Sequence, residues 1–483
     1  MKPSLELERA RQGDAALSIA TDRILIGFWV SVAGIVALLL YAFAAQPSWR
    51  VIGGEAIICA ALVPSYLWCI DRVPGVPVFP VFAITFIGTY AYPLVSGHPI
   101  VLQYSEEASI LAGAKISFFL LIATATWYFV ARAPHPAPRA IRAMAPGRGD
   151  YLFSSIICGA SVLTLGISGV WFSIIPGVFS IIRAALFGLS SVGIFVLAYR
   201  WGRREMDTAR IAAFVGSLAL YLVSQLITLF LITAIVATVL ALAAFVFGRR
   251  ELPWKSALLA LCLFSVLHAG KADMRERYWY PEPLPIQVWH FPVLATEWLG
   301  AGLQAMATAA PDDESQPLYE RLSLVHLLLK VQEESPDEIP YLHGESYAVI
   351  PYLLVPRVLN PEKLAAHEGT TILNVHYGLQ TREDTEKTTI GWGLVNEAAA
   401  NFGLLGIVVL AVLIGIAYGW VTRIALGMPV LSLRTLIAIT FAAFAAQTEF
   451  TAGVYVSALF QSLVSLFAMS FVFMERRVVA DDR

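Results

Sequence analysis

The sequence has few charged residues and lacks the short motifs that mark many enzyme sites. Only 14% of its 483 positions are charged, and it contains no glycine-rich phosphate loop, His-Glu-x-x-His pair, nucleophile elbow or Cys-x-x-Cys. Its four cysteines all lie inside apolar runs, so no cysteine spacing fits a metal or a disulfide in the long polar segment. These absences argue against a nucleotide-driven, zinc-dependent or thiol-based reaction, and we expect no cofactor and no metal.

The sequence also lacks an excess of either positive or negative charge. The formal net charge is −2, which argues against a nucleic-acid partner. Hydrophobic residues instead make up 58% of the chain, and the mean hydropathy is +0.70. The apolar runs are continuous and about twenty residues long, as helices crossing a ~30 Å hydrocarbon core require, whereas barrel strands alternate. The composition predicts an all-α integral membrane protein.

The hydropathy pattern predicts a polytopic bundle of about twelve transmembrane helices. The expected spans are residues 24–45, 51–70, 76–96, 108–131, 151–171, 180–199, 211–228, 229–248, 253–269, 402–421, 435–449 and 455–474. The run 211–248 is too long for one straight helix, so we split it near Gln225 to Phe230. The segment from Met1 to Arg23 shows no cleavable signal pattern, so the first span should remain.

The positions of lysine and arginine predict the orientation of the bundle. Basic residues gather in alternate short loops, which places both termini in the cytoplasm and the stretch from about Gly270 to Asn401 outside. The chain then divides into a membrane part with nine helices (1–269), a large extracytoplasmic loop with interfacial or re-entrant helices (270–401), and a last part with three helices (402–483). We expect a bacterial inner membrane.

The extracytoplasmic loop is acidic, yet its cations lie beside apolar or aromatic residues. From Lys271 to Ala400 it has nine basic and nineteen acidic residues, a net charge of −10. The arginine fork matches phosphate oxygens, and a cluster of cations can stabilise a pyrophosphate leaving group. Seven of the nine basic residues are predicted near the membrane surface: Lys271, Arg275, Arg277, Arg321, Arg357, Lys363 and Arg382. For any one of them the alternative is a snorkelling or salt-bridged surface residue.

The stretch from Pro340 to Pro361 is apolar but cannot form one regular spanning helix, because it contains Pro351 and Pro356. Irregular backbone at membrane depth persists only where protein or a water-filled cavity surrounds it. The stretch also holds His343, Glu345 and Arg357. We therefore expect it to line a cavity.

Two further charges, Lys115 and Arg183, lie inside predicted helices. Ionisable residues within a membrane are costly, which makes both candidates for function. The alternative is that each reaches the interface from near its helix end.

For a general base, the candidates are His343, Glu345, His376 and Glu397. A carboxylate at a desolvated boundary can have its pKa raised toward neutrality, and a histidine starts there. Glu397 has an alternative reading as an acidic residue favoured in a first helical turn.

Three segments resemble the Wzy-type O-antigen and exopolysaccharide repeat-unit polymerases. Tyr341-Leu-His-Gly-Glu-Ser-Tyr347 and Val355-Pro-Arg-Val-Leu-Asn-Pro-Glu-Lys363 are similar to one signature of that family. The run from Thr389 to Gly406 looks like its Glu…Asn-Phe-Gly-x-x-Gly motif, and Gly270 to Trp279 is similar to its Gly-Lys-x-x-x-Arg run. Asn360 stands where the family often has Trp, and Leu364 where it often has Pro.

The resemblance implies a metal-independent, lipid-dependent glycosyltransferase of GT-C-like architecture that joins undecaprenyl-pyrophosphate-linked oligosaccharides on the outer face of the membrane. On this hypothesis Arg321 and Arg357 bind the pyrophosphate or donor, and Glu397 or His343 acts as base. Arg357 and Glu345 are further catalytic candidates. Lys271, Arg275, Arg183, Lys363 and Tyr347 would contact substrate. A partner that sets chain length is a further expectation from the resemblance.

Two other functions remain open from the sequence. A ligase that transfers a finished glycan to lipid A or another acceptor would share the topology and the large outer loop. A transporter or flippase would show internal pseudo-symmetry and paired polar residues at the bilayer midplane, whereas the charges here gather on one external face beside a long asymmetric loop.

Overall fold

The computed structural model describes most of the chain from Ser48 onward. The described residues are 28–29, 31–36, 39–41, 48–134, 140–145, 147, 149–167, 176–229, 231–251, 253–279, 288–308, 323–355, 359–360, 362–387 and 389–478. For the helix that begins at Pro176, the description covers the backbone alone up to residue 185.

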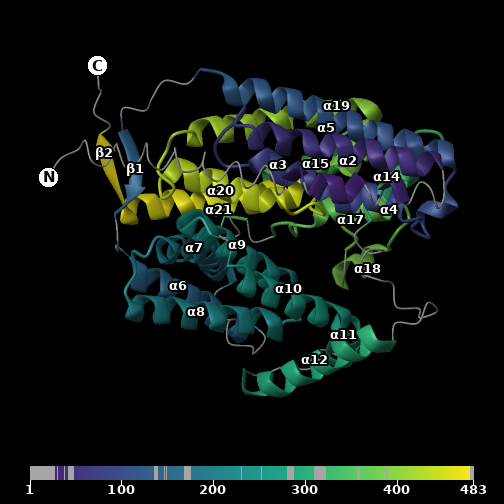
Figure 1. The fold of residues 1–483 in the computed structure, drawn as a ribbon. Coiled ribbons are helices and arrows are strands. Elements are labelled where there is room, and N and C mark those ends of the chain that lie inside the picture. Colours follow the sequence, from purple (N-terminus) through teal and green to yellow (C-terminus); the bar gives the residue numbers. More distant parts are fainter. Residues whose placement is uncertain are drawn as a thin grey trace.

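Helices dominate the described residues and form two lobes (Figure 1). The first lobe contains α2 (Trp49–Cys69), α3 (Val78–Phe86), the π-helix η1 (Ile87–Ala91), α4 (Tyr92–Val95), η2 (Val101–Gln103), α5 (Glu106–Arg132), α14 (Val325–Glu334), α15 (Glu345–Ala348), α16 (Ile350–Leu354), α17 (Glu368–His376), α18 (Arg382–Lys387), α19 (Gly393–Ala425), α20 (Leu433–Ala445) and α21 (Ala452–Phe473). The second contains α6 (Asp150–Ile167), α7 (Pro176–Gly202), α8 (Thr208–Ile227), α9 (Leu231–Arg249), α10 (Trp254–Ala269), α11 (Lys271–Trp279), η3 (Val288–His290) and α12 (Phe291–Thr308).

The chain is a multi-pass, all-α membrane protein. Among the described residues, seven helices are long and apolar enough to cross a membrane, and the bent pair α10–α11 would make eight. The expected break near Gln225 to Phe230 is present, because α8 ends at Ile227 and Leu229 takes a positive φ of 56° before α9. The span expected at 24–45 falls largely outside the described residues, so the count of twelve stays a prediction.

Small residues let the helices of the first lobe approach closely. A Cβ added at Gly113 of α5 would lie 2.6 Å from the Cα of Gly53 on α2. On the other side of α5, a Cβ at Gly415 of α19 would lie 2.6 Å from the Cβ of Thr126. Because α5 lies between α2 and α19, these contacts fix the position of α19, which carries the site described below.

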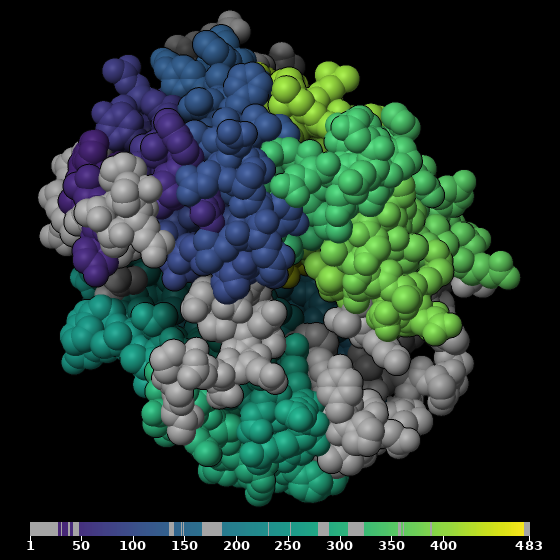
Figure 2. Space-filling model, turned by 90° about the vertical axis from the view of Figure 1, so that its right-hand side faces the viewer, coloured from purple at the N-terminus to yellow at the C-terminus, as the bar shows by residue number. Residues whose placement is uncertain are grey.

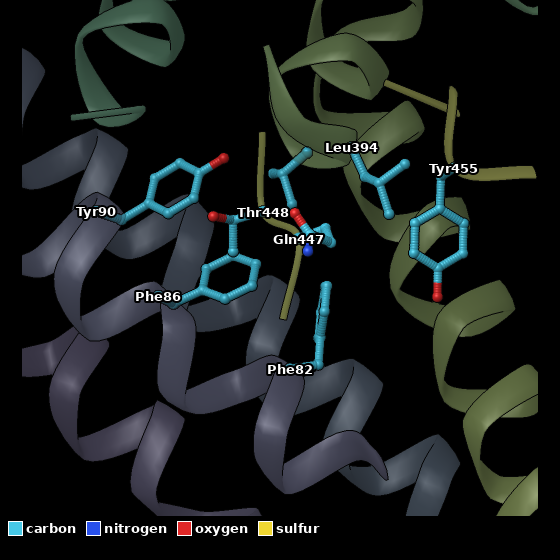
Figure 3. Close-up of a pocket in the computed structure, with 8 residues that line it drawn as sticks. Phe82, Phe86, Tyr90, Leu394, Gln447, Thr448 and Tyr455 are labelled. Atoms are coloured by element: carbon cyan, nitrogen blue, oxygen red, sulfur yellow. The ribbon is translucent and has the colours of Figure 1, made fainter. Parts of the chain in front are cut away.

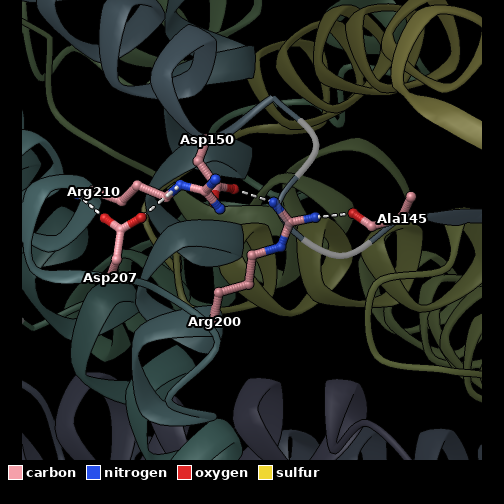
Figure 4. A network of polar contacts seen from close by, with 5 residues as sticks. All are labelled: Ala145, Asp150, Arg200, Asp207 and Arg210. Atoms are coloured by element: carbon pink, nitrogen blue, oxygen red, sulfur yellow. Dashed lines mark hydrogen bonds and ion pairs between the residues drawn. The ribbon is translucent and has the colours of Figure 1, made fainter.

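A buried ion cluster joins three helix ends of the second lobe (Figure 4). Arg200 in the last turn of α7 is fully buried and pairs with Asp150, the first residue of α6. The Arg200 Nη2 also donates to the Ala145 carbonyl at 2.6 Å, and Arg210 of α8 approaches the other Asp150 oxygen at 3.4 Å. Removing one buried partner would leave the other charge uncompensated, so the cluster holds α6, α7 and α8 together.

A two-stranded antiparallel sheet lies at one end of the bundle (Figure 1). Strand β1 (Ala140–Met144) pairs with β2 (Met474–Val478), with Ala140 opposite Val478. We call this the strand end. The opposite end, which carries α14, α17 and α18 (Figure 1), is called the loop end.

The structure differs from the sequence-based expectation at three helices. Helix α19 begins at Gly393 and crosses the expected boundary at 401/402. Helix α20 ends at Ala445, four residues before the expected span does, because the polar residues Gln447, Thr448 and Glu449 form a turn. The hairpin partner α12 was not expected from the sequence, and a Cβ at its Gly302 would lie 2.0 Å from the Val266 carbonyl oxygen of α10.

Candidate functional site

The candidate site is built on the first part of α19, from Gly393 to Asn401. Helix α19 is broken after this part, because Phe402 (φ −142°, ψ 17°) and Gly403 (φ 59°, ψ −141°) are not helical. Only glycine takes the second conformation without strain, and a Cβ at Gly403 would lie 2.8 Å from the Tyr341 hydroxyl. The break lets the stretch that begins at Tyr341 lie directly against the helix.

Three side chains at this contact form a buried hydrogen-bond network. The Ser346 hydroxyl donates to Oε1 of Glu397 at 2.8 Å, and Nδ2 of Asn401 donates to Ser346 Oγ at 2.8 Å. Glu397 and Asn401 are both 0% exposed. Asn401 Nδ2 also donates to the Glu397 carbonyl at 2.8 Å. The network joins two of the segments that carry the family resemblance, although they lie some fifty residues apart.

Backbone contacts fix the same two segments. The N–H groups of Leu342 and His343 donate to the carbonyls of Ala400 and Asn401, each at 3.1 Å. These are carbonyls that the helix break leaves without their usual helical partners. The Gly344 N–H donates to Oδ1 of Asn401 at 2.8 Å. His343 (φ 47°) and Gly344 (φ 97°) both take positive φ to make the turn.

Tyr347 extends the contact on the other side of the break. Its ring stacks on Phe402, with centroids 6.3 Å apart and planes 16° from parallel. Burial, followed by the nearby Glu397 carboxylate, raises the pKa of Tyr347 above its ordinary value. The Tyr347 hydroxyl therefore stays protonated and can act as a hydrogen-bond donor beside the carboxylate.

The second oxygen of Glu397 accepts a hydrogen bond from the first residue of α21. The Ala452 N–H donates to Oε2 of Glu397 at 2.5 Å. Carboxylates are favoured at helix N-termini, where backbone N–H groups have no partner within the helix. Glu397 thus lies inside α19 and caps α21, a role that its reading as a first-turn residue of its own helix did not include.

The turn between α20 and α21, residues 446–451, packs on Gly391-Trp392-Gly393, the run that leads into α19. The Gly393 N–H donates to the Glu449 carbonyl at 3.1 Å, and a Cβ at Gly393 would lie 2.6 Å from the Thr448 carbonyl oxygen. Between the glycines, Nε1 of Trp392 donates to Oδ1 of Asn374 in α17 at 2.7 Å. The glycines therefore allow the turn to reach the site.

This turn carries Glu449, a residue that the sequence analysis missed. Its side chain is exposed to solvent, yet desolvation by the surrounding protein raises the pKa of its carboxyl, and Lys271 of α11 opposes that rise. A carboxyl that solvent can reach, but whose pKa is raised by partial desolvation, is expected in a recess of the protein surface. An acidic residue directly after an apolar run was the signal that could have identified it.

The loop end is hollowed between the two lobes (Figure 2). The hollow lies between the blue and green residues of the first lobe and the teal residues of the second. Lys271 belongs to the teal side, and Glu449 to the first lobe. The two residues therefore come from different lobes, and Lys271 opposes the rise in the pKa of the Glu449 carboxyl.

Behind the α20–α21 turn lies a small enclosed cavity (Figure 3). It holds about 10 Å³ and is lined by Phe82, Phe86, Tyr90, Leu394, Val395, Gln447, Thr448 and Tyr455. That volume corresponds to about one water molecule. This cavity is therefore too small for any ligand larger than a water molecule.

A larger cavity of about 320 Å³ lies at the strand end, where the α2–α3 and α19–α20 connections meet. Trp68, Phe195, Phe247 and Leu426 are among its mostly apolar lining residues. It lies at the other end of α19 from Glu397, so it belongs to a different part of the molecule from the candidate site.

The expected site residues are only partly brought together. His343 and Glu345 are exposed beside the network, and Lys363 is half-buried. His376 Nε2 lies 2.8 Å from the Pro340 carbonyl oxygen, so it supports the same stretch. Arg321 and Arg357 lie outside the described residues, as does the side chain of Arg183, whose backbone is part of α7.

Several other expected cations have contacts within the protein. Arg275 Nη2 donates to the Leu229 carbonyl at the α8–α9 break, at 3.2 Å. Arg277 pairs with Asp273 at 2.9 Å, and Arg382 with Glu368 at 2.7 Å. Those two ion pairs agree with the alternative that Arg277 and Arg382 are salt-bridged surface residues.

The intramembrane Lys115 has a structural partner. Its Nζ donates to Oε1 of Gln332 on α14 at 2.9 Å, and Gln332 Nε2 donates to the Ala108 carbonyl on α5 at 3.1 Å. Lys115 therefore helps to fasten α14, which begins at Val325 and packs its leucines into the core of the first lobe.

Comparison with protein-family models, with curated proteins and with solved structures finds no match to this chain. The candidate site combines a buried Ser-Glu-Asn network with an accessible carboxyl, Glu449, on whose pKa Lys271 acts, at the loop end of a membrane bundle.

Proposed function

We propose that this protein is a lipid-dependent polysaccharide polymerase. It would join undecaprenyl-pyrophosphate-linked oligosaccharide repeat units into O-antigen, capsule or exopolysaccharide on the outer face of the bacterial inner membrane. The observation that carries the proposal is the Ser346–Glu397–Asn401 network, because it brings together two of the separate segments that resemble the polymerase family. Their contact supports a shared role in one site.

The orientation in this proposal has both termini in the cytoplasm and the loop end outside. The strand end carries arginines from several connections, which supports a cytoplasmic position under the positive-inside rule. They include Arg132, Arg142, Arg203, Arg249, Arg423 and Arg476. The proposal retains twelve spans and a GT-C-like architecture.

The reaction needs a base, a site for pyrophosphate and access for a lipid. A hydroxyl of the incoming unit attacks the anomeric carbon of the growing chain. The new C–O bond forms as the bond to undecaprenyl pyrophosphate breaks, and the hydroxyl proton passes to a base. Lys271, together with Arg357 and Arg321, would stabilise the negative charge that develops on the pyrophosphate.

The test is a glycan profile, by gel or mass spectrometry, of a deletion strain complemented with wild type, Arg357→Ala or Arg357→Lys. We expect single repeat units in the deletion strain, long polymer with wild type, and little polymer with either variant, since lysine cannot bind phosphate through the arginine fork. Unchanged polymer in the deletion strain would refute the polymerase, and complete loss of attached glycan would indicate a ligase. Full activity of both variants would remove Arg357 from the site.

A further inference from the structure

The two carboxylates near the α20–α21 turn differ in what they can reach. Glu397 is 0% exposed, and its two oxygens accept hydrogen bonds from Ser346 and Ala452. A carboxylate engaged in this way is poorly placed to take a proton from a substrate in the hollow. Glu449, on the turn itself, has an exposed side chain.

The backbone that carries Glu449 is held firmly. Its carbonyl accepts from the Gly393 N–H at 3.1 Å, and a Cβ at Gly391 would lie 2.8 Å from the Glu449 Cβ. Two residues further on, the Thr451 hydroxyl lies 2.9 Å from the Thr370 hydroxyl of α17. The turn is thus fixed on both sides by the first lobe, as positioning of a catalytic group requires.

The positive charge that acts on the Glu449 carboxyl belongs to a residue of the second lobe. Lys271, the first residue of α11, acts on the Glu449 carboxyl, while desolvation raises its pKa. A base works best when its pKa lies near the operating pH, so the partial desolvation favours proton transfer. The positive charge of Lys271 can also attract an anionic substrate.

We propose that Glu449 is the general base of the polymerisation reaction and that Glu397 is a positioning residue that holds the turn in place. This inference rests on the proposed function. The acceptor hydroxyl loses its proton to the Glu449 carboxylate as its oxygen bonds to the anomeric carbon. The pyrophosphate leaves with the electron pair of the broken C–O bond, and the exposed Glu449 carboxyl returns the proton to solvent.

The test uses the full-length protein in proteoliposomes, supplied with the lipid-linked repeat unit purified from the deletion strain. Initial rates of polymer formation and thermal unfolding are measured for wild type, Glu449→Gln, Glu449→Asp and Glu397→Gln. Glu338→Gln is the matched control, because Glu338 is, like Glu449, an exposed carboxylate, but it lies in the acidic loop and outside the site.

We expect Glu449→Gln to lower the rate by about 100-fold or more with an unchanged unfolding temperature, as for loss of a general base. Glu449→Asp keeps a carboxylate and recovers part of the rate. Glu397→Gln lowers the rate by less than Glu449→Gln does, because its amide can still accept from Ala452. Glu338→Gln matches wild type.

Two results would overturn the inference: a Glu449→Gln rate within about threefold of wild type, or a larger loss with Glu397→Gln than with Glu449→Gln. A wild-type protein that forms no polymer from this substrate would instead contradict the proposed function. The two failures are therefore distinguishable.

Discussion

The N–H of Ala452 donates a 2.5 Å hydrogen bond to Oε2 of Glu397. This bond joins the start of α21 to the first part of α19. The other Glu397 oxygen accepts from Ser346. One carboxylate therefore holds together a helix end, a helix interior and the irregular stretch that begins at Tyr341.

Replacing Glu397 should test this connection. In Glu397→Ala the Ala452 N–H and the Ser346 hydroxyl lose their acceptor inside the protein, and each unsatisfied buried group costs about 1–3 kcal/mol. We expect a clear fall in the thermal unfolding temperature in detergent and a smaller one for Glu397→Gln. Equal unfolding temperatures for the alanine variant and wild type would show that the network adds no stability.

The helix break should depend on Gly403. Its φ of 59° and ψ of −141° belong to a region that only glycine populates, so Gly403→Ala should destabilise the protein by about 1–3 kcal/mol. Gly216→Ala is the control, because nothing lies within 4 Å of a Cβ at that position in α8 and alanine favours a helix. The measurement is thermal unfolding of both variants, and a Gly403→Ala variant as stable as Gly216→Ala would contradict this account.

The ion cluster of the second lobe should be intolerant of neutralisation. Asp150→Asn leaves the fully buried Arg200 without its anionic partner, and breaking a buried pair costs roughly 3–5 kcal/mol. We expect poor yield or a strongly lowered unfolding temperature. Asp273→Asn, which breaks only the exposed pair with Arg277, should cost about 1 kcal/mol at most. If the two substitutions lowered the unfolding temperature equally, the ion cluster would not be what holds α6, α7 and α8 together.

Acid should destabilise the loop end through His326. Burial, followed by the neighbouring His98, lowers the pKa of His326 from 6.5 to about 4. Because the unfolded chain binds the proton more readily, this group stabilises the fold above pH 6.5, and that contribution is lost as the pH falls toward 4. Hydrogen-exchange protection across α14, taken relative to the intrinsic amide rate at each pH, should fall as the pH is lowered from 7 to 5, and His326→Gln should weaken that dependence. An unaltered pH dependence in the variant would assign the effect to other groups.

The sequence predicted the helices of the bundle better than it predicted the site. Continuous apolar runs located α2, α5, α8, α9, α10 and α21 to within a few residues, because hydropathy along one segment is a local property. Helix α12 was missed, since it carries Glu297 and lies within a segment that we took as an outer loop.

The sequence identified those site residues whose own segment shows an unusual feature. Glu397 is predicted as a base because a carboxylate at a desolvated membrane boundary can have a raised pKa. Its acceptor role toward Ala452 depends on a contact across 55 residues that one segment cannot show. Glu449 was assigned to the end of a span, although the polar residues around it and Thr451, a good N-cap residue, indicated a turn. Its relation to Lys271 depends on how the lobes pack.

Helix α21 is fixed at both ends by residues made earlier: Glu397 binds its first N–H, and β1 pairs with the strand that follows it. The contact with Glu397 forms only after Ala452 has been made, and the pairing with β1 only after residues 474–478 have been made. A chain cut short before α20 would keep Lys271 but would lack Glu449 and the Ala452 N–H that binds Glu397. Under the proposed function, such truncated chains in the membrane would therefore be inactive.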